Sequence, residues 1–415
     1  AALAQLALAA GLYAGPVIGD KTVPQMGFYD PARGVIPAPA GASPVMVSFY
    51  RSYLTAGDTA PVDALIQALR AAGFAAYGAF APSLKAPGVA DWLGAHLTAN
   101  PPVAILNATA FSARSDDGRT PFDAADCPVF QVALSTARCR DWLAADRGLS
   151  PADLAMHVVL PEVDGRLFAG LVSHKSPGKR HPDLQFSRFA HRADARRIAA
   201  VVDRVKHWHR LAVTPAADRQ LAVILSTYPG RAHQMAHAVG LDALASTDRL
   251  LESLSAKGYA VTSGAPLVQR LADSLTWPLT DYLTALETLP DALRADLTAA
   301  WGDPATDPAV KEGAFHFAAT RLGHALIALQ PERGEVTTRD ADYHDLSRTP
   351  RHGYVAFYLW LRAQGLHALV HMGAHGTLEW LPGKSVALSD TCWPEALIGP
   401  TPVIYPFIVN DPGEA

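Results

Sequence analysis

Short apolar runs alternate with amphipathic stretches over the first third of the chain. PVMVSFY at 44–50 is a compact apolar run. APVDALIQALRAAG at 60–73 has a proline near its start and a glycine at its end. The first pattern predicts a strand and the second a helix. Apolar runs within FAAYGAF, PPVAILNATAF and CPVFQVAL predict further strands. Strands that alternate with helices favour a parallel sheet covered by helices on both faces.

The same order recurs in the middle of the chain. LAVILSTYPG at 221–230 predicts a strand, and GLDALASTDRLLESLSAKGYAV predicts a helix followed by another strand. Gly73 and Gly258 each end a predicted helix and precede an aromatic residue, so we predict two related α/β units. Farther on, residues 278–330 look mostly helical. HGYVAFYLWLRAQG predicts a helix with an aromatic face, and LHALVHMG and TPVIYPFIV predict strands.

These patterns predict a multidomain α/β protein, in which parallel-sheet α/β units are combined with a mostly helical insertion. A length of 415 residues suits two to four domains at roughly 150 residues each. We divide the chain into an N-terminal helix and linker (1–40), a first α/β unit (41–150), a basic loop and helix connector (151–215), a second α/β unit (216–277), a helical segment (278–335) and the start of a site-bearing region (336–415). The opening AALAQLALAAGLYAG predicts a core helix rather than a signal peptide.

Composition narrows the class of partner. The net charge is −4 and no long basic run occurs, which argues against a nucleic-acid partner. Three cysteines without a C-x-x-C spacing predict neither a disulfide framework nor a cysteine zinc site, and favour a cytoplasmic location. No apolar stretch approaches the ~18 residues of a membrane span, so we expect no membrane partner.

The densest group of chemically active residues is HMGAHGTLEWLPGKS at 371–385. Its Gly-Lys-Ser ending is that of a phosphate loop, but six residues separate Gly376 from Gly383 where that motif allows four. It also lacks the H-E-x-x-H of a zinc protease. LHALVHM therefore predicts a strand, and GAHGTLEW a loop at its C-terminal edge, where open α/β sheets bind ligands. The alternative is a Gly-rich surface turn with solvated side chains.

His371, His375 and Glu379 supply the chemistry of this loop. Imidazole and carboxylate together suit a borderline divalent ion such as cobalt, nickel or zinc. Trp380 and Leu381 would place Glu379 in partly apolar surroundings, where its pKa can rise and the carboxylate can accept a proton.

HMGAHGTLEWLPGKSVALSD resembles the signature of the cobaltochelatase large subunit of the CobN type, which is related to the H subunit of magnesium chelatase. The resemblance extends over almost the whole chain. It includes ILNATAFS, GLSPADLAMHVVLPEVDGR, AVGLDALAST, WGDP and QPERGEVTTRDADYHDLSRTPRHGYVAFYLWLR. The Trp-Leu that follows Glu379 is more similar to the cobalt branch, because the magnesium branch tends to have Phe-Met there.

The resemblance implies a tetrapyrrole-binding subunit that inserts Co²⁺, its substrate, into hydrogenobyrinic acid a,c-diamide in aerobic cobalamin synthesis. It also implies two ATPase-type partner subunits that carry out ATP hydrolysis, which agrees with the missing phosphate loop. The family's large subunit extends beyond both ends of this chain. We therefore expect an internal fragment that does not insert metal alone.

Within this family, we expect Glu379 to accept the ring protons and His371 and His375 to deliver the metal or to face the ring. Lys384 could pair with a carboxylate of the substrate. A second group, His344, Arg348, Arg351 and His352, offers guanidinium and imidazole groups for the carboxylates at the ring's rim. The alternative for this group is a polar loop that caps the following helix.

Three other functions stay open on the sequence. The chain could belong to the magnesium chelatase branch, whose H subunit takes part in inserting Mg²⁺ into protoporphyrin, or to a tetrapyrrole-binding module without insertion activity. A metal-dependent hydrolase fits less well.

Overall fold

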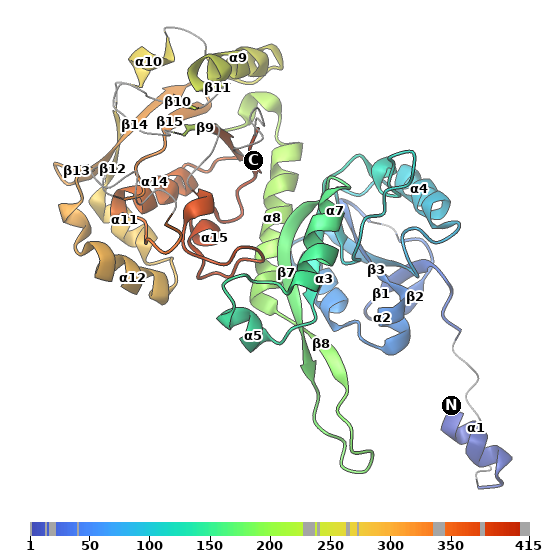
Figure 1. Ribbon diagram of the computed structural model, residues 1–415. Helices are drawn as coiled ribbons and strands as arrows, with labels where there is room; N and C mark the ends of the chain where they lie inside the picture. Colours follow the sequence, from blue (N-terminus) through green and yellow to red (C-terminus); the bar gives the residue numbers. More distant parts are fainter. Residues whose placement is uncertain are drawn as a thin grey trace.

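The computed structural model contains two β-sheets, each flanked by helices (Figure 1). It describes residues 2–12, 15, 22–39, 41–226, 237–238, 241–262, 266–271, 274–334, 345–373 and 378–406. We call the part built on the first sheet the first unit and the part built on the second sheet the second unit. Both units mix strands and helices, so the predicted α/β class is confirmed.

The first sheet has eight strands in the order β2-β1-β4-β3-β5-β6-β7-β8. Strands β4, β3, β5, β6 and β7 are parallel, and β1, β2 and β8 add antiparallel edges. The bounds are Gly27–Asp30 (β1), Gly34–Ile36 (β2), Pro44–Tyr50 (β3), Ala75–Ala81 (β4), Ala104–Asn107 (β5), Val129–Ser135 (β6), Leu167–Pro177 (β7) and Phe189–Ala193 (β8).

The two longest helices of the first unit, α3 and α8, each bury an apolar stripe in the core of this unit. In α3 the stripe is Val62, Leu65, Ile66 and Leu69, at the spacing of a single helix face. The helix ends before Gly73, whose φ of +96° lies in the left-handed region. The bounds are Arg51–Ala56 (α2), Ala60–Ala71 (α3), Val89–Ala99 (α4), Cys139–Ala144 (α5), Pro151–Leu154 (α6), Leu160–Glu162 (α7) and Ala195–Val213 (α8).

The second sheet follows the order β12-β14-β15-β9-β16-β17, with β13 paired to β14. Strands β15, β9, β16 and β17 are parallel, and β12, β13 and β14 are antiparallel additions. The bounds are Leu221–Leu225 (β9), Ser274–Pro278 (β12), Val310–Lys311 (β13), Ala314–Leu322 (β14), Ala325–Leu329 (β15), Ala368–Met372 (β16) and Val403–Ile404 (β17). A separate hairpin pairs His237–Ala238 (β10) with Leu241–Asp242 (β11).

Helix α14 lies at the centre of the second unit, and ten of its residues are buried. Its aromatic side chains belong to the core of this unit together with Phe315, Phe317 and Trp393. The other helices of the unit cover its faces and edges (Figure 1). The bounds are Ala243–Ala256 (α9), Leu267–Arg270 (α10), Leu279–Leu286 (α11), Asp291–Trp301 (α12), His352–Ala363 (α14) and Trp393–Ile398 (α15). None of the described helices combines the length and apolar character that crossing a membrane requires.

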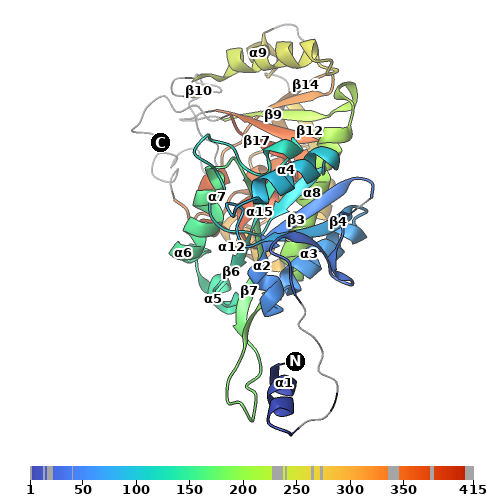
Figure 2. The same cartoon turned by 90° about the vertical axis from the view of Figure 1, so that its right-hand side faces the viewer.

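Three expectations about elements were wrong. Residues 310–329, predicted as helix, are strands, and β14 shows the alternating burial of a strand. The predicted connector at 151–215 contributes β7 and β8 to the first sheet. The N-terminal helix forms as Ala2–Ala9 (α1), but Leu3 and Leu6 are 83% and 66% exposed. This helix lies away from both sheets and is not a core helix (Figure 2).

The second unit does not repeat the helix-then-strand order that was predicted around Gly73 and Gly258. After Gly258 the predicted strand is reduced to one isolated bridge between Val261 and Gly323. The central strands have different neighbours along the chain, because β3 lies between the next two strands, β4 and β5, whereas β9 lies between β15 and β16.

One carboxylate links the two units. Glu395, in α15 of the second unit, accepts a hydrogen bond of 2.8 Å from Arg197 of α8 and another from Arg204 of the same helix. Glu395 is 12% exposed, and Arg197 only 6%. Helix α8 also packs Val201 and Val205 into the core of the first unit, so it lies between the units (Figure 1). Glu395 therefore ties the second unit to a helix that the first unit holds in place.

We predict that Glu395→Gln lowers the free energy of unfolding by about 2–4 kcal/mol, because it leaves two largely buried guanidinium groups without a counter-charge. Urea titration followed by tryptophan fluorescence measures this. Glu252→Gln is the matched control, since Glu252 pairs with Arg249 on the surface of α9, and such pairs contribute about 0–1 kcal/mol. Equal losses in the two variants would contradict the structural role of Glu395.

Candidate functional site

The candidate site lies at the carboxyl ends of three parallel strands of the second sheet. Gln330 follows β15, Ser226 follows β9 and Met372 ends β16. The backbone N–H of Gln330 donates to the Leu225 carbonyl at 2.9 Å, and that of Ser226 donates to the Met372 carbonyl at 3.1 Å. The three strands therefore end together. We call the segment HMGAHGTLEWLPGKS, at 371–385, the motif. As the sequence predicted, the motif leaves the sheet at this edge, which is where open α/β sheets bind ligands.

His371 lies inside β16 and is only 3% exposed. Its ring stacks on Tyr358 of α14, with ring centroids 6.3 Å apart and planes 6° apart. Its Nε2 lies 3.4 Å from the Tyr358 hydroxyl. The Gln330 amide donates to the hydroxyl oxygens of Tyr358 (2.6 Å) and Tyr354 (3.2 Å). These contacts join strand β16, helix α14 and the end of β15 in one buried polar group.

Burial sets the charge of this group. It lowers the pKa of His371 to about 4, so the imidazole is neutral at pH 7 and has the lone pair that a metal ligand needs. The pKa of the Tyr358 hydroxyl is raised well above its usual value, mainly by burial, and the negative charge of Glu379 adds to this effect.

Glu379 itself is exposed, in a short 3-10 turn, Leu378–Trp380. The guanidinium of Arg333, which is buried, donates to the Trp380 carbonyl and so holds this turn. A carboxylate in this position can reach a ligand in solvent. His375, the other predicted metal ligand, lies outside the described residues. Metal binding by His371, His375 and Glu379 together therefore stays a prediction.

The second predicted group begins helix α14. Arg351 forms two hydrogen bonds with the Asp307 carboxylate, at 2.9 and 3.1 Å, and Asp307 also accepts the N–H of Gly353. His352 is buried between the Tyr282 hydroxyl (2.7 Å) and the Gly302 carbonyl (3.1 Å). Both residues are therefore held by contacts within the protein at the start of α14 in this structure.

The other two members of that group give less information. The Arg348 guanidinium lies over the Trp301 ring at 5.8 Å from its centroid, and His344 lies outside the described residues. Contact between any of the four residues and a tetrapyrrole therefore stays a prediction.

Lys384 is turned toward the first unit. Its ammonium donates to the carbonyls of Leu143 at 3.0 Å and Ala145 at 2.9 Å, and it lies over the Trp142 ring at 5.4 Å from its centroid. The Gly-Lys-Ser segment thus binds backbone carbonyls. Pairing with a substrate carboxylate would require Lys384 to give up these contacts.

Further contacts extend this attachment, which we call the clamp: residues 384–387 held against residues 142–148. The Trp142 indole N–H donates to the Ala387 carbonyl at 3.0 Å, and the Ser385 N–H donates to the Asp146 carbonyl at 2.8 Å. Gly148 has a φ of +78°, and a Cβ on it would lie 1.9 Å from the Val386 carbonyl oxygen. The motif is therefore anchored at both ends, by β16 in the second unit and by the clamp on the first.

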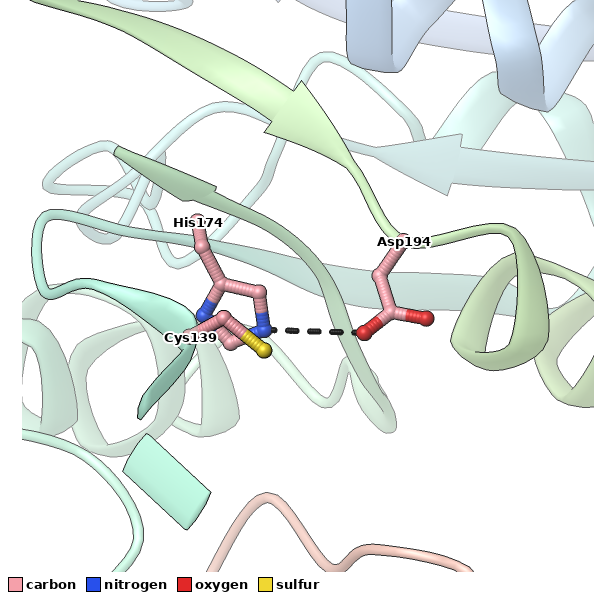
Figure 3. Close-up of side chains that lie close together, drawn as sticks. All are labelled: Cys139, His174 and Asp194. Atoms are coloured by element: carbon pink, nitrogen blue, oxygen red, sulfur yellow. Dashed lines mark ion pairs between the residues drawn. The ribbon is translucent and has the colours of Figure 1, made fainter. Parts of the chain in front are cut away.

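A third group was missed by the sequence analysis. Cys139, His174 and Asp194 have ligand atoms that all lie within 4.8 Å of one another (Figure 3). No other trio of His, Cys, Asp or Glu in the described part of the chain is this close. The three residues come from α5, β7 and the start of α8, so no local spacing in the sequence announces them.

Comparison with known proteins bears out the resemblance. A family model described as CobN/Magnesium Chelatase matches residues 9–415. The chain belongs to the CobN/magnesium chelatase family.

Relatives in this family come from both metal branches. The chain is 38% identical to the aerobic cobaltochelatase subunit CobN of a Sinorhizobium species, over 96% of this chain and 32% of the relative. It is 28% identical to the magnesium-chelatase H subunit of Rhodobacter capsulatus, over 94% of this chain and 36% of the relative. It resembles the solved catalytic subunit of cobaltochelatase from Mycobacterium tuberculosis, with 30% identity and a TM-score of 0.80, over 99% of this chain and 36% of that one. The chain spans about a third of the length of these relatives.

The buried His371 makes the free energy of unfolding of this protein depend on pH, and this dependence can be tested. The pKa of His371 is about 4 in the folded protein, and that of a histidine in an unfolded chain is ~6.5. At a pH between these two pKa values the unfolded chain binds one proton more than the folded chain does. The free energy of unfolding therefore decreases as the pH falls through this range. Between pH 7.5 and 5, His371 accounts for a loss of about 2 kcal/mol. We predict that His371→Asn loses that much less than the wild type over this interval, in urea titrations with a chelator present.

The control is the range above pH 7.5, where the His371 ring is neutral in both states, so the two proteins should change in parallel. Identical losses between pH 7.5 and 5 would show that His371 is protonated in the folded protein.

Proposed function

We propose that this chain is the ring- and metal-handling part of a cobaltochelatase large subunit. The whole protein would insert Co²⁺ into hydrogenobyrinic acid a,c-diamide in aerobic cobalamin synthesis, in the cytoplasm, and two ATPase-type partner subunits would supply ATP hydrolysis. The observation that carries this proposal is the exposed Glu379 carboxylate, in the motif that leaves the second sheet at its carboxyl edge, where His371 is buried against Tyr358. It stands in a chain 38% identical to two CobN proteins.

Metal insertion requires that the inner ring nitrogens lose their protons as the ion enters. In our proposal Glu379 accepts such a proton, because its side chain is exposed to an incoming ring while Arg333 holds the turn beneath it. His371 is neutral at pH 7. It would therefore serve, with His375, as a ligand or guide for the Co²⁺ substrate. The His371 ring is stacked on Tyr358, whose hydroxyl is held by Gln330, and these contacts keep the imidazole in one orientation.

The runner-up is the magnesium branch. Two observations favour cobalt: the higher identity to CobN, and the two histidines that accompany Glu379 in the motif. Mg²⁺ prefers oxygen ligands in near-octahedral geometry, whereas Co²⁺ accepts imidazole nitrogen readily. A tetrapyrrole-binding module without insertion activity is the third candidate, and turnover separates it from the other two.

We predict that Glu379→Gln keeps ring binding and lowers the rate of Co²⁺ insertion by about 10²–10⁴-fold, the usual effect of removing a positioned proton acceptor. The full-length protein is assayed with its two ATPase partners and ATP. Insertion is followed by the absorbance of the corrinoid, and ring binding by quenching of tryptophan fluorescence.

Glu287→Gln is the matched control, because Glu287 is exposed at the end of α11, far along the chain from the motif. Insertion at the wild-type rate by the Glu379 variant would remove Glu379 from the mechanism. The same assay with protoporphyrin and Mg²⁺ tests the branch, since preference for that pair would replace the cobalt assignment by the magnesium one.

A further inference from the structure

The trio Cys139, His174 and Asp194 lies at the border of the first sheet. Cys139 opens α5, His174 lies in β7 and Asp194 caps the N-terminus of α8. His174 Nε2 is 3.6 Å from Asp194 Oδ2, and the Cys139 sulfur lies beside both (Figure 3). The other carboxylate oxygen of Asp194 accepts the N–H of Arg197 at 3.1 Å, so the cap fixes the direction of the oxygen that faces His174.

His174 is the observation that points to a ligand. Its side chain is 4% exposed. Among the residues that the structure describes, Nδ1 has no hydrogen-bond partner, and Nε2 has only the Asp194 carboxylate, whose distance of 3.6 Å is longer than a normal hydrogen bond. Buried polar groups are almost always satisfied, and leaving one unsatisfied costs about 1–3 kcal/mol. An ion bound to this ring would satisfy one of the two nitrogens.

The spacing suits a tetrahedral ion. Bonds of about 2.0–2.3 Å to N, O and S place neighbouring ligand atoms roughly 3.3–3.8 Å apart, and His174 Nε2 and Asp194 Oδ2 are 3.6 Å apart already. The sulfur lies within 4.8 Å of both, so a small side-chain rotation closes the set. Cys139 and Asp194 are only half-buried, which leaves a path for an ion and room for water as a fourth ligand.

The chemistry of the ligands selects the class of ion. One thiolate, one imidazole and one carboxylate suit Co²⁺ or Zn²⁺, and are unsuited to Mg²⁺. Burial lowers the pKa of His174, which keeps the ring neutral, and raises the pKa of the Cys139 thiol. The thiol is therefore protonated without metal, and each ion that binds to its sulfur releases one proton to solvent.

The trio is also next to the clamp. The His174 ring packs on Trp142, with ring centroids 5.1 Å apart. Trp142 in turn contacts the Ala387 carbonyl and the Lys384 ammonium. One aromatic side chain thus separates the trio from the segment that continues the motif.

We propose that Cys139, His174 and Asp194 bind a divalent transition-metal ion of the Co²⁺ and Zn²⁺ type, at a holding site apart from the motif at 371–385. That the ion is Co²⁺ in the cell rests on the proposed function, whereas binding itself does not. An open, three-ligand site next to the clamp suits temporary storage of the metal substrate better than permanent structural binding.

The test is a titration of the metal-free, full-length protein with Co²⁺, without ring or partner subunits. Thiolate ligation gives a sulfur-to-cobalt charge-transfer band in the near ultraviolet, together with the intense visible bands of tetrahedral Co²⁺. Cys139→Ser should remove the charge-transfer band. His174→Gln and Asp194→Asn should weaken Co²⁺ binding by at least about 10-fold, since even loss of an outer contact has an effect of that size.

Cys127→Ser is the matched control, because Cys127 is another half-buried cysteine, outside the trio. It should keep the band and the affinity. Mg²⁺ should not displace Co²⁺. Circular dichroism of each variant checks that the first unit is folded, and Asp194→Glu, which keeps the carboxylate, should restore part of the affinity.

The outcomes separate the holding site from the proposed function. No charge-transfer band in the wild type, or an unchanged band in Cys139→Ser, overturns the holding site whatever the insertion assay shows. A charge-transfer band that Cys139→Ser removes supports the holding site even if Glu379→Gln inserts Co²⁺ at the wild-type rate. That result in the insertion assay would overturn the proposed proton acceptor alone.

Discussion

The attachment of the second unit to helix α8 and to residues 142–148 is the constraint on which the candidate site depends. Among the described residues of the motif, His371 and Met372 end strand β16, and a short 3-10 turn carries Glu379. The motif's position is determined by what holds it at either side, strand β16 before it and the clamp after it. Glu395 adds an ion pair to α8 a few residues later. A shift between the two units would therefore move the loop relative to His371, even if both sheets stayed intact.

His371 and Glu379 differ in how far they are buried, and this difference suits them to different roles. His371 is enclosed by Tyr358, which keeps it neutral and fixed, and Glu379 stands in solvent, where it stays accessible. The trio in the first unit follows a different pattern, with one buried imidazole between two half-buried ligands. The motif offers nitrogen and oxygen donors, and the trio adds a sulfur donor. The two sites would therefore differ in their affinity for the same ion.

The sequence predicted best the features that depend on local pattern. Strand β3 forms at 44–50 as predicted, and the motif does leave the carboxyl end of a strand. The aromatic face of α14 is core. Residues 310–329 were mistaken for helix because their alanine content weakens the alternation that marks a strand. Lys384 could not be placed, since its partners are backbone carbonyls, and Cys139 could not be joined to His174, since only the fold brings them together.

The clamp has a consequence for how this interface can be detected. Leu143, Ala145, Asp146 and Ala387 contribute their carbonyl oxygens, which every amino acid possesses. Side chains at these positions can drift during evolution without loosening the contact, so paired substitutions across it will be scarce. Methods that infer contacts from correlated changes should be nearly blind to this interface. Two places are exceptions. Any side chain at Gly148 meets the Val386 carbonyl, and the Lys384 ammonium lies over the Trp142 ring, so those two side chains can change together.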